Sequence, residues 1–238
     1  MIWPFGRKMS LAESGLLRGS CDVHSHILFG VDDGIKTKDK ALEALSFMEN
    51  LGVEKLWLTP HIMEDVPNET SFLQDRFADL RLSYGGAIEL NMAAEYMLDN
   101  LFDKRLDAMD ILPLGSDMVL VETSLWFSPC NFQEILQKIM RAGYYPLLAH
   151  PERYSYMKLS DYERLSKAGV RFQLNLPSLA GCYGKEVRSK AELLLSKGLY
   201  FKAGSDCHRT NMTEHYYNQP VLSASVRKSL AGLMNKGV

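Results

Sequence analysis

Short runs rich in β-branched and aromatic residues alternate with amphipathic helical stretches along most of the chain. The strand candidates lie at residues 21–24, 53–59, 87–95, 118–122, 145–149, 170–174 and 199–204. The helical candidates lie at residues 37–51, 69–84, 132–142, 160–168, 185–197 and 223–234. Several helical stretches are followed by a glycine, as helix ends often are, at Gly52, Gly85, Gly143, Gly169 and Gly198. This alternation predicts an α/β fold with a parallel sheet, open or closed into a barrel.

Histidines and carboxylates stand at or just beyond the carboxyl ends of the strand candidates. They are His24, His26, His61, Glu95, Glu122, His150, Asp206 and His208. Side chains from many consecutive strands converge only if the sheet closes on itself, because an open sheet would spread them across its width. With about seven strands, the sequence predicts a distorted TIM-like (β/α)7 barrel rather than the regular eightfold one. Residues 1–19 are expected to form an N-terminal arm and residues 20–238 a single domain.

Composition and charge restrict the classes of function. The chain has 238 residues and a net charge of −2, which predicts no electrostatic attraction to nucleic acid or to anionic membranes. No apolar run approaches the roughly 20 residues that a membrane span needs, and the first residues do not follow the pattern of a secretory signal. Four cysteines without a C-x-x-C pair suit a reducing cytoplasm. The sequence does not predict an oligomeric state.

The histidine and carboxylate pattern is typical of a metal site. His24 and His26 are two residues apart on an extended strand, so their side chains share a face and can bind one ion. Asp32 and Asp33 follow in a tight Gly-Val-Asp-Asp-Gly turn that can direct a carboxylate to the same place. Imidazole and carboxylate are the natural ligands of borderline and hard divalent metals. The sequence therefore predicts a site for more than one divalent ion.

The segments around these residues also carry a family resemblance. They are residues 22–26 (DVHSH), 30–34 (GVDDG), 59–61 (TPH), 94–96 (AEY), 121–123 (VET), 149–154 (AHPERY), 173–175 (QLN), 178–181 (SLAG) and 204–208 (GSDCH). In order and spacing they resemble the bacterial tyrosine phosphatases of the PHP (polymerase and histidinol phosphatase) superfamily, the type associated with capsule and exopolysaccharide operons. The resemblance runs from about residue 20 to 210 and implies a metallophosphatase domain with a PHP-type barrel.

The resemblance implies three divalent metal ions, with manganese expected before iron, zinc or magnesium. One ion would be held by His24, His26, Glu95 and Asp206. A second would be held by Glu95, Glu122 and His150, with Glu95 as the bridge. The third would be held by Asp33, His61 and His208. The family's ligand is the carboxylate beside the glycine, which favours Asp33 over Asp32.

The resemblance also implies phosphate-binding and catalytic residues. Arg153 matches an arginine that binds the substrate phosphate in this family. A second family arginine usually lies several residues beyond the S-D-x-H motif, whereas here Arg209 follows His208 directly, so Arg209 is a candidate for that contact. Catalytic roles fall to Arg153, Asp33 and His208. The implied reaction is hydrolysis of phosphotyrosine by a metal-activated hydroxide, on a protein such as the tyrosine-rich tail of a bacterial kinase that controls polysaccharide export.

Other interpretations stay open. Residues 182–189 fit C-x5-R-S, the pattern of cysteine-dependent phosphatases, but Glu186 would place negative charge beside the phosphate. A histidinol-phosphate phosphatase, another small-phosphomonoester phosphatase or a nuclease of the same superfamily is the main enzymatic alternative. Amidohydrolases share the H-x-H signature, but no lysine at a strand end clearly fits their bridging position. A non-catalytic metal-binding regulator of polysaccharide assembly is a further hypothesis, and metal-dependent turnover would separate it from the enzymes.

Overall fold

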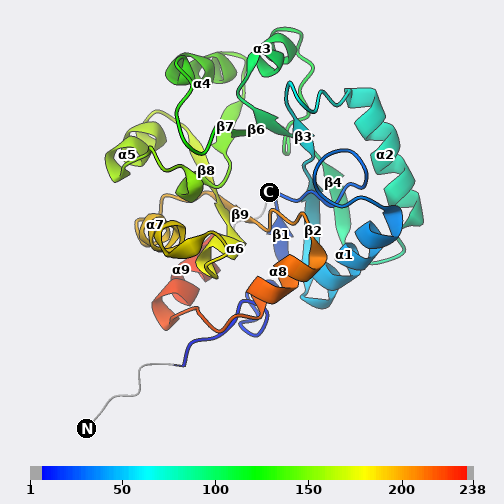
Figure 1. Ribbon diagram of the computed structural model, residues 1–238, viewed down its shortest axis with the longest axis vertical. Helices are drawn as coiled ribbons and strands as arrows, with labels where there is room; N and C mark the ends of the chain where they lie inside the picture. The colour runs from blue at the N-terminus through cyan, green and yellow to red at the C-terminus, as the bar shows by residue number, and fades with distance from the viewer. Residues whose placement is uncertain (1–6, 235–238) are drawn as a thin grey trace.

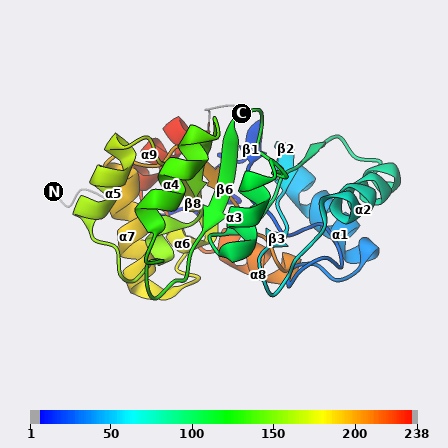
Figure 2. The same ribbon diagram turned by 90° about the horizontal axis from the view of Figure 1, so that it is seen from above.

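The computed structural model describes residues 7–234, in which helices surround a ring of parallel strands (Figures 1 and 2). The strands are β1 (Ser20–Asp22), β2 (Val53–Leu58), β3 (His61–Ile62), β4 (Glu89–Met92), β5 (Glu95–Met97), β6 (Met118–Glu122), β7 (Tyr145–Leu148), β8 (Arg171–Asn175) and β9 (Lys202–Gly204). The helices are α1 (Lys38–Asn50), α2 (Thr70–Ser83), α3 (Asn100–Asp107), α4 (Phe132–Arg141), α5 (Leu159–Lys167), α6 (Leu176–Leu179), α7 (Gly184–Ser196), α8 (Thr210–Tyr217) and α9 (Ala224–Met234), with the 3-10 turn η1 (Pro151–Arg153).

Two strands of the ring are each divided into two short pieces. β2 pairs with β4 and β3 pairs with β5, both in parallel. Across the breaks, Ala93 N donates to Leu58 O at 2.9 Å and Glu95 N donates to Pro60 O at 3.1 Å. Pro60 has no N–H to offer a neighbouring strand, which is a local reason for the break after β2. Counting each divided strand once, the described residues form seven parallel strands, so the predicted distorted barrel is confirmed.

The segment that follows β1 closes the ring, because it hydrogen-bonds both to the end of β2 and to the residues after β9. Ser25 forms a parallel bridge with Cys207, just beyond β9. The carbonyl oxygen of Ser25 accepts a hydrogen bond from Thr59 N at 2.8 Å, and His26 N donates to Cys207 O at 3.1 Å. The two histidines of the H-x-H motif therefore lie between the second strand and the last one, where the ring closes.

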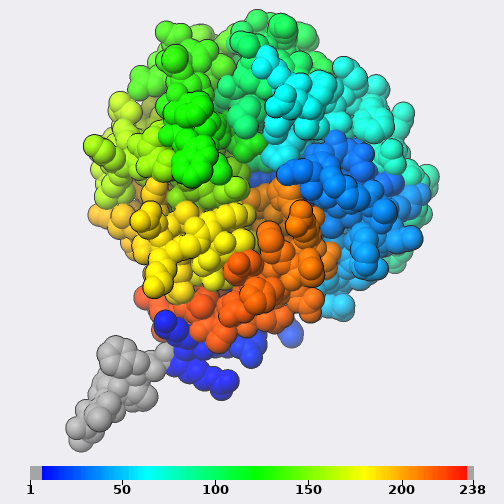
Figure 3. All heavy atoms as spheres, viewed as in Figure 1, coloured from blue at the N-terminus to red at the C-terminus, as the bar shows by residue number. Residues whose placement is uncertain are grey.

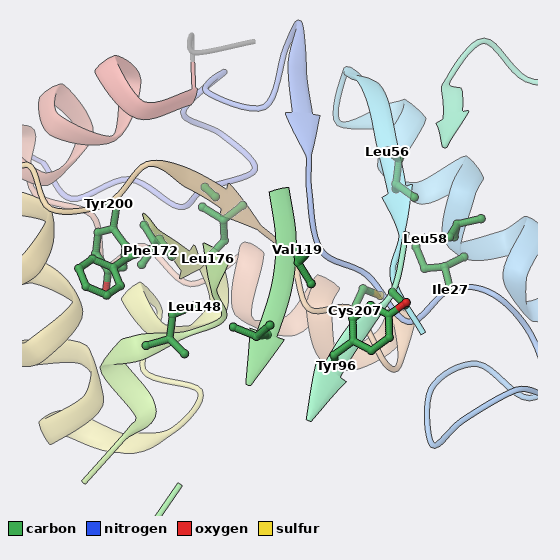
Figure 4. Close-up of a cluster of buried hydrophobic side chains, with 14 of the residues drawn as sticks. Ile27, Leu56, Leu58, Tyr96, Val119, Leu148, Phe172, Leu176, Tyr200 and Cys207 are labelled. Carbon is green, nitrogen blue, oxygen red and sulfur yellow. The ribbon is translucent and has the colours of Figure 1, made fainter. Parts of the chain in front are cut away.

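Apolar side chains pack on both faces of the sheet. In β6, Val119 and Val121 belong to the main buried cluster, which also contains helix residues (Figure 4). Leu120, which lies between them, belongs to a separate small cluster with Leu147 and Ala149. Because successive strand side chains point to opposite faces, the main cluster fills the space between strands and helices, and the small cluster lies inside the barrel. The filled interior leaves the strand ends as the place for a site.

The six predicted helices all form, with ends shifted by one residue at most. The helices α3, α6 and α8 are not among the sequence predictions. α3 is short and mostly polar, and its start is fixed by Asp99, whose side chain accepts a hydrogen bond from Phe102 N. A helix of about two turns contains too few apolar residues to show a helical periodicity, and a single capping residue does not replace that signal. The sequence therefore does not predict α3.

The glycine predictions are correct at four positions and wrong at one. Gly52, Gly143, Gly169 and Gly198 have φ values of 87°, 92°, 96° and 66°, the left-handed conformation in which glycine commonly ends a helix. Gly85 does not have this role. Tyr84, with φ −87° and ψ 115°, leads the chain out of α2 in an extended conformation instead.

The described part of the N-terminal arm is residues 7–19. Met9 pairs antiparallel with Leu222, and Ala12 N donates to Tyr217 O at 3.0 Å. Leu11 and Leu17 are buried in the main cluster. This part of the arm therefore packs against α8 and the segment after it. Among the described helices, none combines the length and the apolar character that crossing a membrane requires.

Candidate metal centre

All nine predicted ligands meet at the carboxyl ends of the strands. Each has a nitrogen or oxygen atom within 3.7 Å of another member. They are His24, His26, Asp33, His61, Glu95, Glu122, His150, Asp206 and His208. Most are buried, while His61, His208 and Asp33 border the open side. The convergence predicted from the strand ends is present in the structure.

Glu95 occupies the middle of this cluster and is fully buried. Its Oε2 atom lies 3.1 Å from Nε2 of both His24 and His26, and 3.3 Å from Nδ1 of His61. Its Oε1 atom lies 3.1 Å from Nε2 of His150. One carboxylate thus faces four imidazole rings from three strand ends, which is the arrangement expected of a bridging ligand.

Three sets of side chains have ligand atoms within 4.8 Å of one another. They are His26, Asp33, His61 and His208; His24, His26 and Asp206; and His61, Glu95 and Glu122. His61 belongs to two sets, because its Nδ1 lies 3.1 Å from Glu122 Oε1 and its Nε2 lies 3.6 Å from Asp33 Oδ1. His150 Nε2 lies 3.7 Å from Glu122 Oε2. The surroundings of Glu122 therefore include His61 in addition to the predicted His150.

The two aspartates of the turn after β1 have different positions. Asp33 joins the open side of the cluster, with Oδ1 3.4 Å from His208 Nε2. The Asp32 side chain is fully buried, and its Oδ2 lies 2.8 Å from His26 Nδ1 and accepts a hydrogen bond from His61 N at 3.0 Å. Asp32 thus orients a histidine from behind, and the carboxylate that faces the other ligand atoms belongs to Asp33.

Two amide side chains of β8 support the cluster and were not assigned a role from the sequence. Gln173 Oε1 lies 3.0 Å from His24 Nδ1 and accepts a hydrogen bond from His150 N at 3.1 Å. Asn175 Nδ2 donates to Asp206 Oδ2 at 2.7 Å. Both amides are fully buried. The sequence signals for them are two amides at the end of a buried strand, since a buried amide needs partners, and their place in the family-like segment 173–175.

Backbone conformation helps to aim the ligands. His150 and Asp206 have φ values of 32° and 51°, a conformation that is rare for residues other than glycine and that concentrates at functional sites. Gly34 ends the turn of the aspartates, where a Cβ would overlap the carbonyl oxygen of His26. The glycine is required because the turn must approach the H-x-H segment this closely.

The electrostatics of the cluster suit cations. Burial opposes the charge on His24, but the carboxylates of Glu95 and Asp206 outweigh burial and raise the pKa of His24 to about 10. The same balance, with Glu95 and Glu122 as the carboxylates, raises the pKa of His61 to about 10. Burial would raise the pKa of Glu95, yet the neighbouring histidines hold it well below its usual range. The carboxylates therefore keep their charge and attract positive charge onto the rings.

Buried ring nitrogens that lack hydrogen-bond partners also favour a site for cations. His61 Nδ1 lies 3.1 Å from Glu122 Oε1, but in a direction that does not form a hydrogen bond, and it is buried without any other such partner. His150 Nδ1 is also buried without one. Buried polar atoms are normally hydrogen-bonded. Imidazole rings beside ionised carboxylates, with Nδ1 of His61 unsatisfied among them, fit divalent metal ions, which would replace the protons on the rings.

Arg153 borders a cavity of about 310 Å³ that opens over the cluster. Its NH1 atom lies 3.3 Å from Asp206 Oδ2, and its guanidinium lies 4.3 Å from the centre of the Tyr183 ring. Arg209 and His208 line the same cavity. Figure 3 shows this face of the molecule, hollowed near its centre where segments from many parts of the chain meet. The cavity has a positive wall beside the ligand cluster, as a phosphate requires.

The cysteine-phosphatase interpretation of residues 182–189 does not fit this geometry. Cys182 is half-buried, and burial raises the pKa of its thiol, whereas a nucleophilic cysteine needs a lowered pKa. Arg188 donates to Glu192 Oε1 at 2.9 Å and to Val221 O at 3.0 Å, so its guanidinium is engaged elsewhere. The C-x5-R-S match therefore does not form a phosphate loop.

Comparisons with known proteins agree with the resemblance seen in the sequence. The model of the family described as "Capsular polysaccharide synthesis, CpsB/CapC" matches residues 20–227. The tyrosine-protein phosphatase CpsB of Streptococcus pneumoniae is 29% identical over 218 residues, which cover 83% of this chain and 86% of that protein. The putative tyrosine-protein phosphatase CapC of Staphylococcus aureus is 24% identical over 221 residues, which cover 85% of this chain and 84% of that protein.

A solved structure shows the same fold. It comes from work on YwqE from Bacillus subtilis and CpsB from Streptococcus pneumoniae, described as "unique metal-dependent tyrosine phosphatases". It matches with a TM-score of 0.74 at 21% sequence identity, over 91% of this chain and 96% of that chain. Since the family model spans most of the chain and the site residues lie within it, this protein belongs to the CpsB/CapC family of capsular polysaccharide synthesis.

Proposed function

We propose that this protein is a metal-dependent protein-tyrosine phosphatase that acts on phosphotyrosine proteins of capsule or exopolysaccharide synthesis. The observation that carries the proposal is the convergence of nine imidazole and carboxylate side chains, seven of which line one cavity together with Arg153. The relatives CpsB and CapC carry the names of a tyrosine-protein phosphatase and a putative one. The family and the chemistry of the site thus support the same reaction class, hydrolysis of a phosphoric monoester.

The nine side chains would hold three divalent ions, manganese being preferred. Three sets of close ligand atoms support this count, and the mixture of imidazole and carboxylate suits manganese or iron. Bound ions would supply Lewis acidity toward phosphoryl oxygens and lower the pKa of water. Glu95 would be shared between two of the ions, and its contacts with four histidines support this role. Asp32 and Gln173 keep the rings of His26 and His24 in a fixed orientation.

Arg153 binds the phosphate in this proposal. A guanidinium offers pairs of N–H groups that match phosphate oxygens. Asp206 and the ring of Tyr183 hold that guanidinium in place, and its Nε is buried without a hydrogen-bond partner. Arg209 is exposed on the same cavity and supplies the second contact. The arginines neutralise charge on the phosphoryl group as it is transferred.

The leaving group of phosphotyrosine hydrolysis needs little stabilisation by the protein. A phenolate has a pKa of about 10, so it departs with modest stabilisation, and no covalent phosphoenzyme is required. Asp33 and His208, 3.4 Å apart at the mouth of the cavity, belong to the catalytic group in this proposal. They act as ligands closest to the side from which the substrate enters.

The partner and the location complete the proposal. The substrate would be a phosphorylated bacterial tyrosine kinase that controls polysaccharide export, with the tyrosine-rich tail as the segment that enters the site. The cytoplasm is the proposed location, supported by the four unpaired cysteines, since disulfides are rare in reducing compartments. No nucleic acid is part of the function.

A phosphotyrosine peptide assay tests this function. The purified protein would be measured as prepared, after chelation, and after manganese is added back, with Cys182→Ser as a control. We expect turnover that the chelator removes, that manganese restores and that Cys182→Ser leaves unchanged. Turnover that survives chelation but is lost in Cys182→Ser would overturn the metal-dependent mechanism. A protein that binds metal yet never turns over the peptide would favour another substrate or a regulatory role.

A further inference from the structure

A second hollow, of about 570 Å³, adjoins the site cavity on one side. It lies between the start of α1 and the first turns of α8, and Asp33, His208 and Arg209 line both spaces. In Figure 3 α8 (orange) and the blue segments that include α1 border each other on this face. We call this hollow the α1–α8 groove. It is continuous with the proposed active site and larger than it.

The walls of the α1–α8 groove carry charges of both signs. Beyond the residues shared with the site, the lining residues include Lys36, Lys40, Glu43, Asn211 and Glu214. Lys40 Nζ lies 2.7 Å from Glu43 Oε2, and Lys36 Nζ donates to the carbonyl oxygen of Asp32 at 2.6 Å. The two lysines are balanced in charge by Glu43 and Glu214 in the same lining. A second phosphate would find no excess positive charge here, so the groove does not extend the phosphate site.

Neutral polar groups in the groove suit a polypeptide better. Thr210, at the start of α8, has a buried Oγ1 atom without a hydrogen-bond partner, and Asn211 beside it is exposed. Peptide groups supply both donors and acceptors, and the aliphatic stems of lysine side chains offer apolar contact. An extended chain with few charges therefore matches the lining.

The position of the groove follows from what a phosphotyrosine substrate requires. The site cavity of about 310 Å³ is at the lower end of ligand pockets, which span roughly 300–1,000 Å³. It suits one phosphorylated side chain, while the backbone on either side must leave through the open rim. Asp33, His208 and Arg209 form the part of the rim that opens into the groove.

We propose that the α1–α8 groove binds the polypeptide on one side of the phosphotyrosine, so that the protein favours phosphotyrosine within an extended segment over small phosphomonoesters. The inference rests on the proposed phosphatase function and adds to it the surface that binds the polypeptide beside the phosphotyrosine. Contacts remote from the reacting bond raise kcat/KM for substrates long enough to make them. Small phosphate esters reach only the site cavity and gain nothing from the groove.

A nested series of peptides tests the groove. Each peptide carries one phosphotyrosine and none, two or four neutral residues on its N-terminal or its C-terminal side, and 4-nitrophenyl phosphate serves as the small substrate. For the manganese-loaded wild type we expect kcat/KM to rise by about tenfold or more as residues are added on one side. In Glu214→Trp, which fills the groove, this rise should disappear while 4-nitrophenyl phosphate turnover stays within about twofold.

Matched variants separate the groove from general effects. His215→Trp adds the same bulk to the neighbouring exposed residue of α8, which does not line the groove, and should keep the length dependence. Glu214→Gln removes the charge without the bulk and should also keep it. Asn211→Trp fills the groove from one turn away and should repeat the effect of Glu214→Trp. Equal metal content and circular dichroism would show that all variants fold.

The outcomes distinguish this inference from the function on which it rests. A wild type that turns over both substrates without any dependence on peptide length would overturn the groove and leave the phosphatase standing. Length dependence that persists in both Glu214→Trp and Asn211→Trp would also overturn it. A wild type that hydrolyses neither 4-nitrophenyl phosphate nor any peptide would overturn the proposed function and the groove together.

Discussion

Asp32 lies directly behind His26, with 2.8 Å between Oδ2 of the carboxylate and Nδ1 of the ring. This contact turns the other ring nitrogen, Nε2, toward Glu95 at 3.1 Å. Asp33, the next residue, has a side chain that is 73% exposed and faces His208. Two adjacent aspartates therefore serve one cluster in different ways, since one orients a ring and the other meets the ligand atoms directly.

Substitution of the two aspartates should give different results. Asp32→Asn should lower metal affinity by about 10- to 100-fold, the usual effect of losing a carboxylate that orients a metal-bound histidine, and excess manganese should restore turnover. Asp33→Asn removes a proposed ligand at the mouth of the site, so saturating manganese should restore turnover only in part. Activity measured against manganese concentration checks both variants. Identical curves for the two would contradict their separate roles.

Glu95→Gln should remove metal and turnover together. The amide keeps the shape of the side chain but loses the charge that faces four histidines, and a buried cluster of this kind depends on that charge. Metal content by mass spectrometry and phosphotyrosine turnover are the measurements. Glu89→Gln is the control, because Glu89 is exposed on β4 and lies outside the site. A Glu95→Gln protein that retains full turnover would refute the bridging assignment.

Arg153→Ala should lower kcat/KM for phosphotyrosine by about tenfold or more while metal content stays near normal, because the proposed function assigns the arginine to the phosphate rather than to a metal. Arg153→Lys should recover only part of the loss, since an ammonium cannot form the paired contact. Turnover and bound metal are measured on the same samples. Loss of metal from Arg153→Ala would mean that its contact with Asp206 at 3.3 Å is structural.

Arg209→Ala distinguishes a phosphate contact from a peptide contact. If Arg209 supplies the second phosphate contact, KM should rise for 4-nitrophenyl phosphate and for phosphotyrosine peptides by a similar factor, about three- to tenfold. The residue lines both the site cavity and the α1–α8 groove, so a rise confined to peptides would assign it to the groove instead. Steady-state kinetics with both substrates decide between these results.

Metal binding should release protons at neutral pH. In the metal-free protein, Glu95 and its neighbouring carboxylates raise the pKa of His24 and of His61 to about 10 against the effect of burial, so both rings are protonated at pH 7. Metals bind neutral imidazole, so these protons must leave as metal enters, and metal affinity should fall as the pH is lowered. Calorimetric titration in buffers of different ionisation enthalpy measures the release. Heats that do not depend on the buffer would contradict this expectation.

The α/β class, the seven strands and the six longer helices could be predicted from the sequence, because they depend on local periodicity and on helix-ending glycines. The sequence also placed the nine candidate ligands at strand ends. Their order along the chain, one or two per strand, was sufficient to predict a closed sheet, and the candidate ligands within the family-like segments meet in the structure.

The contacts among these residues came from the folded structure. The different positions of Asp32 and Asp33, the contacts of His61 with both Asp33 and Glu122, and the support from Gln173 and Asn175 depend on distances between segments that are far apart in the chain. Local sequence patterns record which face a residue occupies, but not which side chains meet across a closed barrel. That meeting is set by strand register and by the breaks in the divided strands, for which the sequence gives little local signal.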